Sequence, residues 1–210
     1  MRIKMGGLRA SIMGLMAALL LATPATAESA KDGADHAAGD QQPVTSSAIG
    51  GTFVLRDHFG RVVYDQDLRG KYMLVYFGYT FCPDVCPTTL QTMGTVLDQL
   101  GDQADKLWPL FITVDPQRDT VKVLHDYVAA FHPKILGLTG PEPYVESVIA
   151  KYHVVVEKVP TPGTPGGYTL DHTSSLFLMD PYGVYVRRYP HGMPAEDIVA
   201  DLKERMKATP

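Results

Sequence analysis

The stretch from Phe77 to Leu90 reads FGYTFCPDVCPTTL and contains both cysteines of the 210-residue chain. Cys82 and Cys86 are separated by three residues and follow an apolar run at residues 73–77, whose length and composition are typical of a buried strand. The apolar side chains after them repeat with a period near 3.6, as on one face of a helix: Leu90, Met93, Leu97 and Leu100. The two thiols are therefore predicted to lie on the turn between a central strand and a helix, where open α/β sheets bind ligands.

The prolines beside the cysteines predict how this turn is built. Pro87 suits the first position of a helix, and Cys86, which precedes it, is disfavoured in the helical conformation, so we expect Cys86 to be the N-cap. Cys82 lies in a turn set by Pro83, which should close the two sulfurs over a common point. Because unpaired N–H groups and the helix dipole stabilise a thiolate, Cys86 is expected to be partly exposed and to have a low pKa.

Residues 1–27 have the features of an export signal. Three basic residues precede an apolar run of 13 residues, at positions 10–22, and Ala25-Thr26-Ala27 offers a small-x-small cleavage site. The run is short for a membrane span, which needs about 20 residues. We therefore predict a cleaved secretory signal and a periplasmic location. The alternative is an uncleaved anchor, which would give the domain its only membrane contact.

The charge of the exported chain limits its partners. Removal of the signal takes away three positive charges and lowers the formal net charge from −4 to −7. This acidity argues against nucleic acid or an anionic membrane surface as a partner. Residues 28–48 are rich in small and polar side chains without apolar periodicity, so we expect a disordered linker. Residues 49–207 are predicted to form one domain.

Strand and helix signals alternate along this domain. A β-hairpin at residues 53–64 is followed by alternating strands and helices, a late hairpin at 175–189 and a closing helix at 194–207. Residues 153–159 are expected to be a further strand and residues 160–170, which contain three Pro and three Gly, a loop without regular structure. The order predicts an α/β, thioredoxin-like sandwich: a mixed central sheet with flanking helices and an extra N-terminal β-hairpin. A flavodoxin-like sheet is the alternative.

Two thiolates supply only part of a metal site. Cu(I) and Zn(II) favour thiolate ligands, and either metal needs at least one more ligand. Among the seven histidines we single out His172, because the last crossover of a thioredoxin-like sheet leads to a strand that starts beside the cysteine turn. Thioredoxins place a cis-proline there, whereas this chain has Asp171-His172-Thr173. An imidazole at this point would face both sulfurs; the alternative is a histidine that is bonded to the backbone.

Four segments together carry the motifs of a known family. They are FGYTFCPDVCPTTL at 77–90, TVDPQRDT at 113–120, GLTG at 137–140, and Asp171-His172 before LFLMD at 176–180. The combination resembles the Sco/SenC family over residues 50–205. The resemblance implies a thioredoxin fold that binds one copper through Cys82, Cys86 and His172. It also implies a metallochaperone that takes part in assembling the binuclear copper centre of cytochrome c oxidase subunit II.

The residue types are consistent with this role. Two thiolates and one neutral imidazole would give Cu(I) three ligands and leave it open to attack by the thiols of another protein, and binding of Cu(II) is a further possibility. We expect copper transfer by ligand exchange, with a periplasmic copper donor and a thiol reductant as additional partners. Asp171 or a backbone carbonyl is expected to fix the tautomer of His172. Asp115, at a strand end on the same sheet edge, is a weaker candidate and is alternatively a turn carboxylate.

Other functions stay open at this point. One is a thiol–disulfide reductase in which Cys82 and Cys86 cycle, for which His172 is not required. A peroxiredoxin-like peroxidase is disfavoured, because that class needs Thr or Ser three residues before the reactive cysteine, where this chain has Tyr79. A copper-sensing or redox-signalling protein is the third class. A purely structural disulfide is disfavoured, since a bridge that closes so short a loop removes little chain entropy.

Overall fold

The computed structural model of the chain describes residues 48–208. The expected signal at residues 1–27 and residues 28–47 of the expected linker lie outside this range and stay predictions. None of the helices within the described range combines the length and the hydropathy that a membrane span requires.

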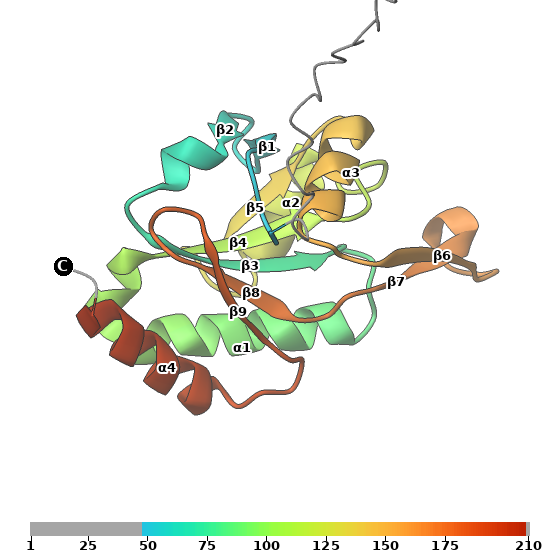
Figure 1. The fold of residues 1–210 in the computed structure, drawn as a ribbon. Helices are drawn as coiled ribbons and strands as arrows, with labels where there is room; N and C mark the ends of the chain where they lie inside the picture. The colour runs from blue at the N-terminus through green and yellow to red at the C-terminus, as the bar shows by residue number, and fades with distance from the viewer. Residues whose placement is uncertain (1–47, 209–210) are drawn as a thin grey trace, which may run out of the picture. The chain divides into compact units, whose positions relative to one another are not determined.

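A mixed sheet of seven strands forms the centre of residues 48–208, in the order β2-β1-β5-β4-β3-β8-β9 (Figure 1). Its strands are β1 (Val54–Asp57), β2 (Val62–Tyr64), β3 (Tyr72–Gly78), β4 (Leu107–Thr113), β5 (Leu136–Thr139), β8 (Leu176–Met179) and β9 (Tyr185–Tyr189). Strands β3, β4 and β5 are parallel, whereas β1 pairs with β5, and β8 with β3, in the antiparallel sense. The predicted mixed sheet with an N-terminal hairpin is therefore confirmed.

Four helices within the described residues cover the two faces of this sheet. They are α1 (Val85–Leu100), α2 (Val121–Val128), α3 (Glu142–Lys151) and α4 (Ala195–Ala208). Figure 1 shows α1 and α4 on one face and α2 and α3 on the other. The predicted apolar stripe of α1 is buried against the sheet, with Leu90 and Met93 fully inaccessible to solvent. Because both faces are covered, β3 is buried along its whole length and reads as a continuous apolar run.

The helix after the cysteine turn begins earlier than predicted. Asp84 is the N-cap of α1 and Val85 its first residue, which places Cys86 at the second helical position and Pro87 at the third. The expectation that Cys86 would be the N-cap is therefore wrong. The first four N–H groups of a helix have no partner within it, so the missing N–H of a proline is tolerated anywhere in that turn.

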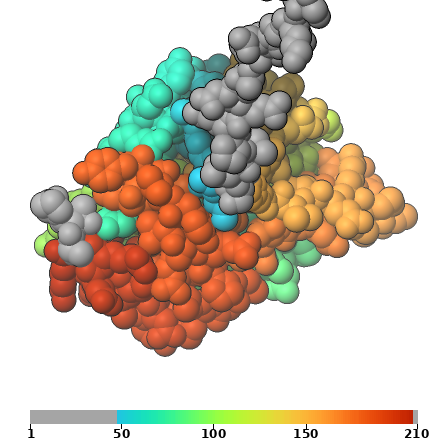
Figure 2. All heavy atoms as spheres, in the orientation of Figure 1, coloured from blue at the N-terminus to red at the C-terminus, as the bar shows by residue number. Residues whose placement is uncertain are grey.

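The segment before β8 also differs from the prediction. β6 (Val156–Pro160) and β7 (Tyr168–His172) pair only with each other and form a separate antiparallel ribbon, which extends beyond the central sheet on the right of Figures 1 and 2. The Pro- and Gly-rich segment, expected to be irregular, contains the turn of this hairpin. Gly166 and Gly167 both have φ near +80°, a conformation that other residues rarely adopt. His172 is the last residue of β7 and lies four residues before Leu176, where β8 begins.

A buried carboxylate fixes the end of the sheet that carries the cysteine turn. Asp119, fully buried in the loop between β4 and α2, accepts hydrogen bonds from the Thr113 hydroxyl at 2.6 Å and the Thr80 hydroxyl at 2.6 Å. It also accepts one from the Thr80 N–H at 3.1 Å, and its backbone carbonyl accepts one from the Thr139 hydroxyl. Burial raises the pKa of Asp119. The residue thereby joins the ends of β4 and β5 to the turn that leads to Cys82.

We predict that Asp119→Ala lowers the free energy of unfolding by about 3 kcal/mol, because it leaves several buried donors without an acceptor. Urea unfolding followed by circular dichroism measures this loss. Asp126→Ala is the control: Asp126 pairs with Lys122 at the surface, and loss of an exposed pair should change the free energy of unfolding much less. Equal losses in the two variants would contradict the prediction.

Candidate metal centre

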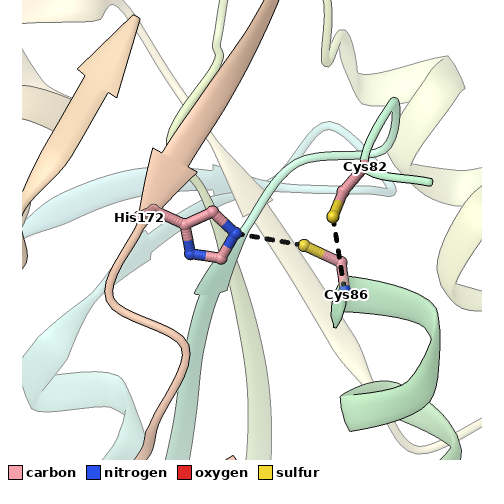
Figure 3. A group of neighbouring side chains, drawn as sticks. All are labelled: Cys82, Cys86 and His172. Atoms are coloured by element: carbon pink, nitrogen blue, oxygen red, sulfur yellow. Dashed lines mark hydrogen bonds between the residues drawn. The ribbon is translucent and has the colours of Figure 1, made fainter. Parts of the chain in front are cut away.

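Three potential metal ligands meet at the carboxyl end of β3. Cys82 lies on the turn after this strand, Cys86 in the first turn of α1 and His172 at the end of β7. Figure 3 shows the three side chains pointing toward one another, and their ligand atoms all lie within 4.8 Å of each other. His172 Nε2 is 3.3 Å from the Cys86 sulfur, and the Cys86 N–H donates to the Cys82 sulfur at 3.4 Å. Within residues 48–208 this is the one group of three or more such side chains.

Strand pairing explains how a residue from late in the chain reaches the cysteine turn. β8 runs antiparallel to β3, and its first residue, Leu176, lies opposite Tyr76 near the carboxyl end of β3. The segment that enters β8 must therefore arrive beside the turn that leaves β3. His172 lies four residues before Leu176 on this segment. The predicted convergence of His172 with the two cysteines follows from this arrangement, although its backbone belongs to the β6–β7 ribbon.

The ring of His172 is held in one tautomer. Its Nδ1 lies 3.1 Å from the backbone carbonyl oxygen of Thr173, which can only accept a hydrogen bond. Nδ1 therefore carries the proton, and the lone pair of Nε2 is directed at the sulfurs. Of the two expected partners of this imidazole, the structure supplies the backbone carbonyl. Asp171 instead lines the cavity beside the site.

The two thiols differ in exposure and in proton affinity. Cys82 is partly exposed, whereas the Cys86 side chain is turned into the core and is fully buried. Hydrogen bonding from the Cys86 thiol, assisted by the N–H groups of Asp84 and Cys86, lowers the pKa of Cys82 to about 3. Its thiolate partner, together with burial, raises the pKa of Cys86. The pair thus holds one proton, on Cys86.

This distribution corrects the expectation that Cys86 would be the partly exposed thiol of low pKa. The helix N-terminus does favour a thiolate, but its N–H groups point at the sulfur of Cys82. The side chain of Cys86 is directed into the core, away from these N–H groups. Cys82, in the preceding turn, receives these hydrogen bonds instead.

The buried side of the site is closely packed. A Cβ atom at Gly78 would lie 2.9 Å from the Cys86 sulfur and 3.1 Å from Cε1 of Tyr76, so the last residue of β3 has room only for hydrogen. The rings of Tyr76 and Tyr79 both meet the His172 ring edge-on, at centroid distances of 6.1 and 5.9 Å. These contacts leave the three ligand atoms little freedom on the core side.

The opposite side is open. A surface cavity of about 370 Å³ is lined by residues 82–85 of the cysteine turn, residues 169–172 of β7, Tyr79 and Ser174. Cys82 and His172 belong to its wall, whereas the buried Cys86 does not. A side chain of another protein can therefore reach two of the three potential ligands directly.

The weaker candidate Asp115 lies outside the group of three. It is buried, forms an ion pair with Arg118 and accepts a hydrogen bond from the Tyr168 hydroxyl at 2.9 Å. Arg118 also donates to the backbone carbonyl of Tyr168 at 3.1 Å, and the Tyr79 hydroxyl accepts the N–H of Leu170 at 3.1 Å. These contacts fasten β7 to the cysteine turn. Sequence reasoning missed Arg118 and Tyr79, although both lie within the motifs it singled out.

The donor set suits a soft monovalent metal. Thiolate sulfur and imidazole nitrogen are ligands that Cu(I) prefers. This chain supplies both types of ligand itself. Harder cations such as Mg²⁺ and Ca²⁺ would require oxygen ligands, and none of the three grouped side chains offers one.

Comparisons with known proteins agree with this site. The SCO1/SenC family model matches residues 41–207. A SCO2-like protein of Rickettsia felis is 39% identical over 155 residues, which cover 74% of this chain and 76% of the relative. Two solved structures with copper bound are also similar. ScoI of Bradyrhizobium japonicum is 44% identical, with a TM-score of 0.70 over 75% of this chain and 99% of that one. Yeast Sco1 is 37% identical, with a TM-score of 0.71 over 78% of this chain and 91% of that one.

The match thus covers the strand, the cysteine turn and the histidine segment from which the three potential ligands come, and the chain is a member of the SCO1/SenC family.

Proposed function

We propose that this protein is a copper-binding metallochaperone that delivers copper to the binuclear copper site of cytochrome c oxidase subunit II during oxidase assembly. The observation that carries the proposal is the meeting of Cys82, Cys86 and His172 within 4.8 Å. Family membership supports it, because the Bradyrhizobium and yeast relatives have been solved with copper bound. Cu(I) is the proposed cargo, and Cu(II) is a second form that the imidazole can help to bind.

The exposure of the ligands suggests how copper would be released. Cys82 and His172 face the cavity, while Cys86 is buried. A thiolate of the target would enter this cavity and bind copper as one exposed ligand leaves, so that each step exchanges one bond to copper for another. Cys86 would be the last ligand to dissociate from copper. No net oxidation or reduction is required in this sequence.

The location and the remaining partners belong to the same proposal. An export signal at residues 1–27 would place the domain in the periplasm, where the oxidase site is assembled. A copper donor there would load the site, and a thiol reductant would keep Cys82 and Cys86 reduced, since a disulfide between them would remove two of the three ligands.

A second candidate function is a thiol–disulfide reductase, and the asymmetry of the thiols favours it. The exposed thiolate of Cys82 can attack a disulfide, form a mixed disulfide and release one target thiolate. The Cys86 thiol, after losing its proton, can then attack Cys82 and release the second. The target gains two electrons and the pair becomes a disulfide, which the thiol reductant must reduce again. His172 is dispensable for this cycle.

We predict that His172→Ala weakens Cu(I) binding by at least about 10-fold, because it removes one of three ligands. Competition with a chromophoric Cu(I) chelator measures the affinity. His125→Ala, at an exposed histidine of α2, is the matched control and should bind copper as the parent does. Unchanged affinity in His172→Ala would remove this residue from the site.

A second prediction separates the two candidate functions. The reduced, Cu(I)-loaded domain should pass copper to a fragment of subunit II that carries the two cysteines of its copper site faster than the copper-free domain reduces a test disulfide. The physical reason is that ligand exchange replaces bonds to copper one at a time, whereas disulfide reduction has to break a covalent S–S bond. Stopped-flow mixing measures both rates under one set of conditions. Faster disulfide reduction, with no transfer of copper, would favour the reductase.

A third prediction concerns the thiols of the copper-free domain. Since the pKa of Cys82 is lowered to about 3, its rate of alkylation by iodoacetamide should stay constant from pH 8 to pH 5. The same thiol in urea, with an ordinary pKa of about 8.5, should react about tenfold more slowly with each pH unit below that value. Mass spectrometry assigns the labelled residue. Parallel pH profiles for folded and unfolded chains would contradict the prediction.

A further inference from the structure

A buried tyrosine hydroxyl beside the site has no hydrogen-bond partner among the described residues. Tyr76 lies on β3 and is fully inaccessible to solvent, and its hydroxyl oxygen is unpaired. Its polar neighbours are the thiol of Cys86 and the hydroxyl of Thr89. A hydroxyl that is buried without a partner costs free energy, so its presence calls for a physical reason.

The edge of the Tyr76 ring lies against the sulfur of Cys86. A Cβ built on Gly78 would be 3.1 Å from Cε1 of Tyr76 and 2.9 Å from that sulfur, so both atoms border the same small space. Cε1 is bonded to the ring carbon that carries the hydroxyl. Tyr76 therefore presents its polar end to Cys86 from the buried side of the site.

The other polar neighbour is already engaged. The hydroxyl of Thr89 donates to the backbone carbonyl of Val85 at 2.8 Å and lies 3.0 Å from Nδ1 of His191. The sulfur of Cys86, which lies 3.3 Å from Nε2 of His172, is the neighbour that remains as an acceptor. Tyr76 thus has a hydrogen to donate, and the sulfur of Cys86 is the acceptor beside it, although the hydroxyl is unpaired in the metal-free structure.

We propose that the Tyr76 hydroxyl is a hydrogen-bond donor to the sulfur of Cys86 in the copper-bound state. This inference rests on the proposed copper site and extends it. A metal-bound thiolate carries negative charge and accepts hydrogen bonds more strongly than a thiol does. Tyr76 is a positioning residue, because it acts on copper through Cys86.

The inference makes one substitution change two properties in opposite directions. Tyr76→Phe removes an unpaired buried hydroxyl and keeps the ring, so the copper-free domain should be as stable as the parent or more stable. The same change should lower Cu(I) affinity by about 10-fold, the lower end of the effect of partners that support metal ligands. The rise in melting temperature on copper loading should shrink accordingly. A residue with a purely structural role would not separate these readouts.

The chain offers a matched control in Tyr127→Phe. The Tyr127 hydroxyl, on α2, is also buried without a partner among the described residues, and its ring packs against Phe111 at a centroid distance of 5.6 Å. It has no hydrogen bond with either cysteine, so Tyr127→Phe should change the stability of the copper-free domain in the same direction and leave copper affinity unchanged.

Chelator competition for Cu(I) and urea unfolding of the reduced, copper-free domain are measured for the parent and both variants. Selective loss of affinity in Tyr76→Phe supports the inference. Equal affinity in the parent and Tyr76→Phe overturns it while leaving the copper site intact. Loss of affinity together with loss of stability, or equal losses of affinity in both variants, also overturns it. Failure of the parent itself to bind Cu(I) would instead refute the proposed function on which the inference rests.

Discussion

The antiparallel pairing of β8 with β3 is the constraint on which the site depends. It brings together Cys86 and His172, which are 86 residues apart in the sequence, at one end of the central sheet. Closing a loop of that length costs conformational entropy, and the two side chains alone could not offset this cost. The buried strands offset it, because β3 and β8 lie in the core with almost no exposed surface. The donor set is therefore a property of the folded sheet.

The two halves of the site are held in different ways. The cysteine turn is joined to the sheet by Asp119, whose carboxylate lies in the core. His172 belongs to a ribbon outside the central sheet and is fastened through Tyr79 and Arg118, which bond the backbone of β7. The two halves also differ in their exposure to solvent, since Cys86 is buried and His172 lines the cavity. In the proposed copper site, a ligand on a separate ribbon is suited to leave the metal without disturbing the core.

The spacing of apolar residues was sufficient to predict many of the helices and strands, because buried strands and amphipathic helices each have a characteristic spacing. The strand before Cys82, the stripe of α1 and the late hairpin were all predictable in this way. The β6–β7 ribbon was not, since its Pro- and Gly-rich turn resembles an irregular loop. Which of the two cysteines is exposed and has the low pKa, and the roles of Asp119 and Tyr76, depend on the direction of side chains in the folded state. Contacts between distant segments determine this direction, and the spacing of apolar residues in the sequence does not reveal these contacts.

The charge of the thiol pair links the metal-free structure to the proposed cargo. With Cys82 ionised and Cys86 protonated, the two side chains carry a net charge of −1. Two thiolates with bound Cu(I) also carry −1, so loading exchanges one proton for one cuprous ion without adding charge to a buried site. Burying additional charge is costly, and this exchange avoids that cost. A pair that holds a single proton between two sulfurs is thus already matched to a soft monovalent cation.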